Sequence, residues 1–484
     1  MIHNPNSLLP IVVFDETDDW NSVRQLCSEY LDQPGQGRLE TALSANTKCV
    51  AVEHHYIDKD YRDTFSNFHS KRFSTPGSRC VRLHFFNRQV SPDELKEPAN
   101  IQENYLGYSV IRPTRPNSIG RTLIDFKNYT GLGVYVCSCK EKVSLQGTEL
   151  EVEGFPFISQ DTDATVCAQS ALWMMARYFS NQYTIYPESY PSQISNLVQD
   201  YAVGSRVVPA DGLYTWQLAE TLRRLGLSPI TYSRAGFDPD TFRRILYTYV
   251  ESGIPVLAVI PGHVVVLNGH SSDFSPLAAV TSPTFSSNFC NGITVNDDNH
   301  IPYQYISETS TTHNGINFAD IKEVVVGLAE KVFLTAENFE KVVLNILDDP
   351  IVGIKKLSPE LAKEPLILRM FLTTVKSYKK KVSSRGMGDP KVESTYRELP
   401  LPHFIWICEL STPEEYGKGN VLGEIIWDAT RNARETEGWI AIHYPEVLLI
   451  DAGSSLNDPQ KLLNFNLTLG NQPYSMYRSN LKEV

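Results

Sequence analysis

The sequence predicts an α+β protein: a central domain in which one buried helix packs on an antiparallel sheet, flanked by two mixed α/β domains. The chain has 484 residues, which is too long for one hydrophobic core and favours about three domains. A strongly apolar stretch from Cys167 has the periodicity of a buried helix, and β-branched runs bounded by Gly and Pro follow from Ile254. We expect the domains to span residues 1–153, 154–335 and 336–484.

The composition is that of an ordinary globular protein, with 42% hydrophobic and 21% charged residues. The net charge of −12 argues against a nucleic-acid partner, because binding phosphates needs a basic surface. No apolar run is long enough to span a bilayer, and the first residues lack the features of a secretory signal. The eight cysteines form neither metal-binding pairs nor a disulfide pattern. We therefore expect a cytoplasmic protein with no membrane partner, no metal and no other cofactor.

The first domain is expected to mix helix and strand. The pattern predicts an amphipathic helix over residues 15–30 and strands over 48–53, 80–86 and 105–111. Metal binding needs a fixed geometry that the polar residues around the first strand do not supply by their spacing. We interpret these as surface residues and place no site there: Glu53, His54, His55, Asp58 and Asp60.

Helices come first in the central domain, and strands follow. After the Cys167 helix we expect helices over residues 214–225 and 238–253, the second of which begins with Asp238 before a proline. A pair of strands should then meet at a Pro-Gly turn, and a Ser/Pro/Thr-rich loop should lead to a third strand. The strands are expected at 254–260, 263–269 and 292–296, with the loop at 271–291.

The last domain should begin with a helix capped by Thr335. Ser358-Pro359 predicts a helical region that reaches Val375, and the basic, Gly-rich residues 376–390 predict a solvated loop or hairpin tip. Later runs predict strands of an antiparallel sheet at 404–408, 423–428 and 447–451.

Cys167 lies where a cysteine can act as a nucleophile, because it opens the apolar helix. Unpaired backbone N–H groups and the dipole at a helix start favour an anion, here the thiolate. Free cysteines are more often small buried hydrophobes, and this stretch alone leaves that role open. The apolar positions of the helix recur at helical spacing: Ala168, Ala171, Leu172, Met175 and Phe179.

Further residues can complete a catalytic arrangement around this thiol. His263 opens a strand directly after a Pro-Gly turn, where its imidazole can serve as the base for Cys167. Asp297 ends the next strand and can orient that base, since consecutive strands are commonly neighbours. Gln160 can supply a side-chain oxyanion donor beside the backbone N–H of Cys167. Each residue alone has a plainer structural explanation, and it is their joint order that indicates a catalytic site.

This order resembles the papain-like cysteine peptidases, and more closely their bacterial double-glycine (bacteriocin-processing, C39-like) branch. The resemblance covers roughly the middle third of the chain and implies a papain-like fold there. It implies Cys167 as nucleophile, His263 as base, Asp297 as orienter and Gln160 as oxyanion donor. The matching segments are Gln160, Cys167-Ala168-Gln169-Ser170-Ala171, Gly262-His263-Val264-Val265-Val266-Leu267-Asn268-Gly269 and Asn296-Asp297-Asp298.

The spacing departs from the family at two places. Gln160 lies seven residues before Cys167, one more than is usual in the family. His263 and Asp297 are 34 residues apart, more than the family's typical gap, and residues 271–291 account for the excess. The flanking domains resemble no family, and no transporter segment accompanies the central domain.

The resemblance implies a thiol hydrolase that cleaves a peptide or isopeptide bond through an acyl-enzyme. Its substrate would be a peptide or protein, and the flanking domains would select that substrate or hold a protein partner. An acyltransferase or side-chain deamidase would use the same thioester. A catalytically silent binding or scaffold protein would keep the fold without the reaction.

Two neighbouring carboxylates compete for the role of orienter. By the period-two alternation of a strand, Asp297 shares a face with the apolar Ile293 and Val295 and should point inward, towards His263. Asp298 should point outward as a turn residue. We therefore expect catalysis to depend strongly on Asp297 and only mildly on Asp298, unless a bulge shifts the register.

Overall fold

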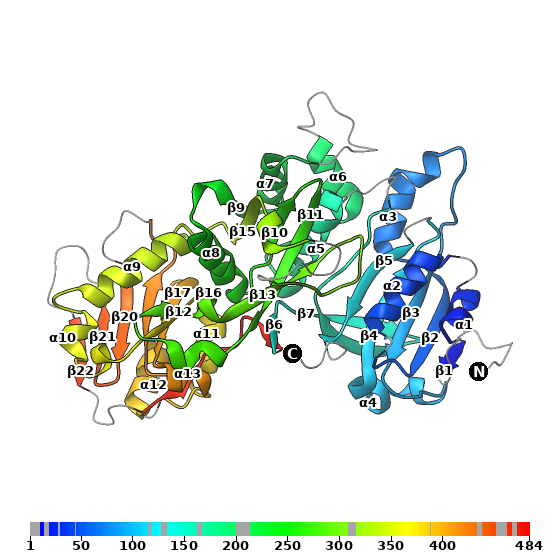
Figure 1. Cartoon of the computed structure of the whole chain (residues 1–484). Helices are drawn as coiled ribbons and strands as arrows, with labels where there is room; N and C mark the ends of the chain where they lie inside the picture. Colours follow the sequence, from blue (N-terminus) through cyan, green and yellow to red (C-terminus); the bar gives the residue numbers. More distant parts are fainter. Residues whose placement is uncertain are drawn as a thin grey trace.

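The computed structural model describes residues 10–13, 19–27, 30–43, 45–114, 118–126, 133–161, 167–199, 213–307, 316–387, 389–432, 438–451, 462–466 and 472–484. These residues mix helix and strand, as expected for the α+β class. Figure 1 shows the N-terminal strands in blue at one end, the middle of the chain in green and the C-terminal strands in orange at the other end. No helix in the described ranges has both the length and the apolar character needed to cross a bilayer.

The N-terminal part is built on a five-stranded antiparallel sheet in the order β1-β2-β3-β4-β5, beside a β7-β8 hairpin. The strands expected in this part are confirmed as β2, β3 and β4. The helix expected over residues 15–30 is described only as the shorter α1. Residues 15–18, 28 and 29 of the expected range lie outside the described residues. The strands are β1 (Ile11–Val13), β2 (Cys49–Tyr56), β3 (Cys80–Phe86), β4 (Tyr105–Ile111), β5 (Ile119–Ile124), β7 (Cys139–Leu145) and β8 (Thr148–Gly154), and the helices are α1 (Asp19–Leu26), α2 (Gln33–Leu43), α3 (Lys59–Asn67) and α4 (Pro98–Ile101).

The central sheet is antiparallel in the order β14-β13-β11-β10-β15-β9. Helix α5 packs on β11 in the interior of this sheet, and 12 of its 16 residues are buried. The expectation of a buried helix starting at Cys167 is therefore confirmed. The helices are α5 (Cys167–Gln182), α6 (Pro191–Gln199), α7 (Thr215–Arg224) and α8 (Pro239–Glu251), and the strands are β9 (Leu227–Ser233), β10 (Val256–Ile260), β11 (His263–Ser272), β13 (Cys290–Asn296), β14 (Gln304–Ser307) and β15 (Glu323–Ala329).

The C-terminal part contains a seven-stranded sheet in the order β12-β16-β17-β19-β20-β21-β22. Its strands are antiparallel, as expected, except for the parallel β12-β16 pair. The strands are β12 (Thr284–Phe285), β16 (Ile367–Thr374), β17 (Phe404–Ser411), β18 (Asn420–Val421), β19 (Gly423–Asp428), β20 (Trp439–Tyr444), β21 (Val447–Asp451), β22 (Leu462–Asn466) and β23 (Tyr474–Ser475), and the helices are α9 (Ala336–Asp348), α10 (Ile354–Leu357), α11 (Val375–Val382), α12 (Pro390–Glu398) and α13 (Pro413–Gly417).

Three short strands pair in a sheet across an expected domain boundary. β6 (Val134–Val136), from the first part of the chain, pairs with β11 of the central sheet. β24 (Lys482–Glu483), at the C-terminus, returns to pair with β6. β12 comes from the middle of the chain and extends the C-terminal sheet. The central sheet therefore includes strands from the first and last parts of the chain, and the C-terminal sheet includes one strand from the middle.

Two expectations for the C-terminal part are wrong. The end of the helical region expected to reach Val375 is strand β16, whose apolar residues are buried between β12 and β17. A continuous apolar run is compatible with either a buried helix or a buried strand, so the pattern was ambiguous. The loop expected from residue 376 begins instead with helix α11. The side chain of its N-cap residue, Thr374, accepts a hydrogen bond from the backbone N–H of Ser377. Tyr378 and Val382 anchor this helix one turn apart.

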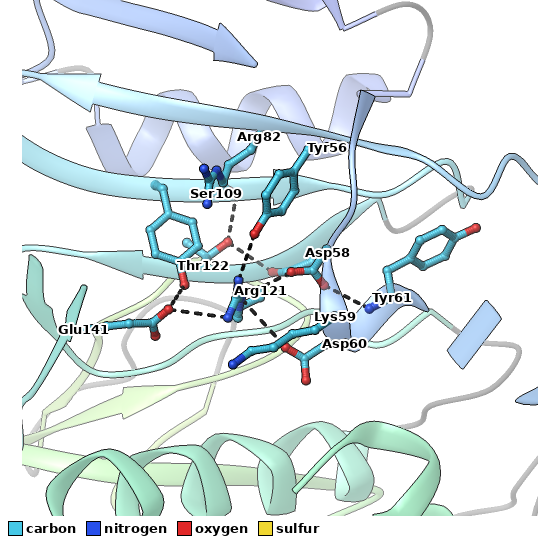
Figure 2. A network of polar contacts seen from close by, with 12 residues as sticks. Tyr56, Asp58, Lys59, Asp60, Tyr61, Arg82, Ser109, Arg121, Thr122 and Glu141 are labelled. Carbon is cyan, nitrogen blue, oxygen red and sulfur yellow. Dashed lines mark hydrogen bonds and ion pairs between the residues drawn. The ribbon is translucent and has the colours of Figure 1, made fainter. Parts of the chain in front are cut away.

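An ion-pair cluster ties the N-terminal part to α5. Trp173 and Arg177 of α5 each donate a hydrogen bond to Asp60 Oδ1, at 2.9 and 2.7 Å. Arg121 of β5 lies 3.8 Å from the other oxygen of Asp60 and 3.3 Å from Asp58 (Figure 2). Both aspartates are buried, so their interpretation as surface residues is wrong. Burial raises the pKa of Asp60 to about 6 in spite of the neighbouring arginine charges.

Replacement of Asp60 by alanine should destabilise the protein strongly. The change leaves the guanidinium of Arg177 and the indole N–H of Trp173 buried without this acceptor, and breaking a buried ion pair typically costs about 3–5 kcal/mol. Thermal unfolding of Asp60→Ala should show a clear loss of stability. Asp93→Ala is the control, since its partner Lys96 and Asp93 itself are exposed. Equal melting temperatures for the two variants would contradict the stabilising role of Asp60.

Candidate functional site

Cys167 is the first residue of α5 and the one cysteine of eight that is not buried. The site therefore begins at a helix N-terminus, where the dipole favours a thiolate. The remaining seven cysteines are buried, and burial raises the pKa of several of their thiols, for example to about 12 at Cys27 and about 11 at Cys49. Those thiols are held in the neutral, inert form.

His263 is brought to this helix by the β10-β11 hairpin. It opens β11 and pairs with Ile260 across a two-residue turn in which Gly262 has φ 72°, a conformation that favours glycine. The side chain of Cys167 lies close enough to the imidazole for its hydrogen-bonding interaction to help raise the pKa of His263. Because β11 packs on α5, the base and the thiol are fixed by the same helix–sheet contact.

Asp297 follows β13, which neighbours β11 in the sheet. The Nε2–H of His263 donates to Asp297 Oδ1 at 2.7 Å, which leaves Nδ1 as the ring nitrogen for the sulfur of Cys167. Burial disfavours the imidazolium, but the hydrogen bonds with Asp297 and Cys167 and the nearby carboxylate charges outweigh it and raise the pKa of His263 to about 10. The same contact lowers the pKa of Asp297 below its usual value although that carboxyl is buried.

Asp298 does not point outward, so this expectation is wrong. Its side chain is buried, and its Oδ1 lies 3.5 Å from His263 Nε2. The chain leaves the strand geometry after Asn296 and enters a turn in which the N–H of His300 donates to the carbonyl of Asp297. Period-two alternation no longer holds there, so both carboxyl groups fall on the side of His263. Burial raises the pKa of Asp298 to about 7.

Gln160 is connected to this site by hydrogen bonds through Asn299. The Gln160 amide donates to Asn299 Oδ1 at 2.5 Å, and the backbone N–H of Asn299 donates to Asp297 Oδ1 at 2.9 Å. Asn299 also places its side-chain nitrogen 3.5 Å from His263 Nε2. The structure thus brings Gln160, His263 and Asp297 together. Residues 162–166, which connect Gln160 to Cys167, lie outside the described residues.

The sequence interpretation did not include three of the neighbouring residues. Asn299 belongs to the polar turn after β13, and its position beside two aspartates was the available signal. His300 places its Nε2 3.6 Å from Asp297 Oδ2, the carboxyl oxygen that His263 does not contact at 2.7 Å. Arg38, from the N-terminal part, donates to the backbone carbonyl of Asp298 at 3.4 Å. No local pattern around Arg38 indicates this contact, because it is made across 260 residues of chain.

The same side chains also offer ligand atoms to a cation. Among the described residues, one group of possible metal ligands is found, and it consists of His263, Asp297 and Asp298. One ligand atom from each of these residues lies within 4.8 Å of the other two. Imidazole and carboxylate groups suit several divalent ions. In the structure, however, His263 already donates to Asp297, so this hydrogen bond would have to be broken before an ion could bind.

The arrangement has the parts required for nucleophilic catalysis by a thiol. A cysteine at a helix start contacts an imidazole, and a buried carboxylate holds the opposite ring nitrogen. With its pKa raised to about 10, His263 is protonated at neutral pH and can hold a thiolate as an ion pair.

Comparison with known proteins adds no family to this picture: no protein-family model matches the chain, and no curated protein sequence matches it.

Proposed function

We propose that this protein is a papain-like thiol hydrolase that cleaves a peptide or isopeptide bond through an acyl-enzyme on Cys167. The observation that carries the proposal is the continuous chain of contacts from Cys167 through His263 to Asp297. A cysteine with a purely structural role does not require a charged imidazole beside it. A histidine with no function does not require two buried carboxyl groups, so this combination favours a catalytic site.

In the first half of the reaction, the thiolate of Cys167 attacks the carbonyl carbon of the scissile bond. A carbon–sulfur bond forms, and the carbonyl oxygen becomes an oxyanion. His263 then donates its Nδ1 proton to the leaving nitrogen, the carbon–nitrogen bond breaks, and the amine departs. The substrate's acyl group is left on Cys167 as a thioester.

In the second half, neutral His263 takes a proton from a water molecule that attacks the thioester. The carbon–sulfur bond breaks, the acyl group leaves as a carboxylic acid that loses its proton to solvent, and the thiolate–imidazolium pair is restored. Asp297 keeps Nε2–H in place through both steps, so Nδ1 always faces the sulfur.

Gln160 and the backbone N–H of Cys167 are the proposed donors to the oxyanion. The Gln160 amide has two N–H groups, one of which is used by Asn299; the second has no partner among the described residues and can serve the oxyanion. Loss of one such donor typically lowers a rate by about a hundredfold. The contact with Asn299 therefore uses one N–H of the Gln160 amide and also holds that side chain in position.

Cys167→Ala should abolish peptide cleavage, because the covalent step has no substitute nucleophile. Purified protein would be incubated with a synthetic peptide library and new termini detected by mass spectrometry. The melting temperature should change little, since the truncated side chain is small. Cys49→Ala is the matched control and should retain cleavage, because this thiol is buried in β2. Products formed equally by Cys167→Ala would refute the assignment of the nucleophile.

Asparagine substitutions should separate the two carboxyl groups by their pH dependence. Asp297→Asn should lower kcat/KM by at least about a hundredfold at pH 6 and at pH 8, because the tautomer of His263 is no longer held. Wild-type Asp298, with its pKa raised to about 7, carries its proton at pH 6 and loses it by pH 8.

Asparagine resembles the protonated acid, so Asp298→Asn should stay within about threefold of wild type at pH 6. It should fall further behind at pH 8, where the missing negative charge no longer supports the imidazolium. Both profiles can be measured on one peptide identified from the library. Equal losses for the two variants at pH 6 would show that Asp298 shares the role of orienter.

A further inference from the structure

A cavity of about 480 Å³ lies between the far end of α5 and the C-terminal part of the chain. This volume is within the range of pockets that bind small molecules. The end of α5 and the turn after it form one part of the lining, and the end of β16 with the start of α11 forms a second part. Residues 479–480 of the C-terminal segment contribute to the lining as well.

The part of the lining formed by α5 and the turn after it is aromatic, and its rings pack on one another. The rings of Phe179 and Tyr183 are stacked with centroids 6.2 Å apart, and Tyr186 meets Phe179 edge-on at 5.7 Å. Ile185, also in the lining, has 68% of its surface exposed, which is unusual for a large aliphatic side chain. This part of the lining suits a flat or aliphatic ligand body.

The part of the lining formed by β16 and α11 is basic. Lys376 and Lys380 lie one turn apart on α11, and His403 adjoins them where its carbonyl accepts a hydrogen bond from the N–H of Val375. No aspartate or glutamate is among the described residues that line the cavity. Neither lysine forms an ion pair within the described part of the chain, although surface lysines elsewhere do, as Lys418 does with Glu414 at 2.6 Å.

Two neighbouring cations with no ion-pair partner among the described residues are unusual in a chain whose net charge is −12. Cations left together without carboxylates repel one another, and an anion placed between them relieves this repulsion. The cavity is also separate from the thiol: α5 has 16 residues, so its two ends are about 24 Å apart. A small ligand in this cavity cannot reach Cys167.

We propose that this cavity is a binding site for a small organic anion with an aromatic or aliphatic body. The apolar body packs on Phe179, Tyr183 and Tyr186, and the anionic group faces Lys376 and Lys380. The proposal does not depend on the hydrolase activity, since it rests on the opposite end of α5.

The test uses a pair of fluorescent probes that differ in charge. The anionic probe is 8-anilinonaphthalene-1-sulfonate, and its uncharged counterpart is N-phenyl-1-naphthylamine. Binding of each to the full-length protein would be measured by fluorescence titration, with stoichiometry from calorimetry. The variants are Lys376→Gln combined with Lys380→Gln, and Lys381→Gln as the matched control, because Lys381 is on the same helix but outside the lining.

The anionic probe should bind at one saturable site, and the double variant should weaken it at least tenfold. Lys381→Gln should change its affinity less than twofold, and the neutral probe should be affected little by either variant. Raising the ionic strength should weaken the anionic probe alone. Ile185→Ser, an exposed change, should weaken both probes. Absence of a saturable site, or equal effects of the double variant and Lys381→Gln, would overturn the proposal.

Discussion

The burial of helix α5 is the constraint on which the rest of this structure depends. The helix is apolar around most of its circumference, so it must be covered on several sides. The central sheet covers one side and carries His263 to the helix start through β11. The polar groups of Trp173 and Arg177 inside this packing need partners, and Asp60 of the N-terminal part supplies them. Cys167 is thereby fixed by a helix that the N-terminal and central parts of the chain hold together.

The electrostatics of the candidate site follow from the turn after β13. This turn places Asp297 and Asp298 on the same side, against one imidazole. Two like charges cannot both be stable in a buried site, so their acid strengths separate. Asp297, hydrogen-bonded to His263, keeps its charge, while burial favours the neutral form of Asp298. One carboxylate therefore forms the ion pair, and its neighbour adds a charge that depends on pH near neutrality.

Sequence patterns identified the elements whose signals are local. The helix beginning at Cys167, the capping of α8 by Asp238 and the hairpin before His263 each depend on residues within a few positions. Elements with long-range causes were missed. The apolar residues of β16 become a strand because β12 and β17 flank them, and Arg38 reaches the site only through the packing of the N-terminal part. Asp298 was misplaced because strand alternation was extended one residue into a turn.

In the proposed mechanism, His263 holds Cys167 as a thiolate, and the pH dependence of alkylation tests this step most directly. Iodoacetamide would be applied between pH 5 and pH 9, and mass spectrometry would follow each of the eight cysteines separately. The account predicts that Cys167 reacts rapidly and almost independently of pH down to pH 6, and that His263→Ala removes this reactivity at pH 6. A Cys167 rate that falls about tenfold for each pH unit below 8, with no effect of His263→Ala, would contradict it.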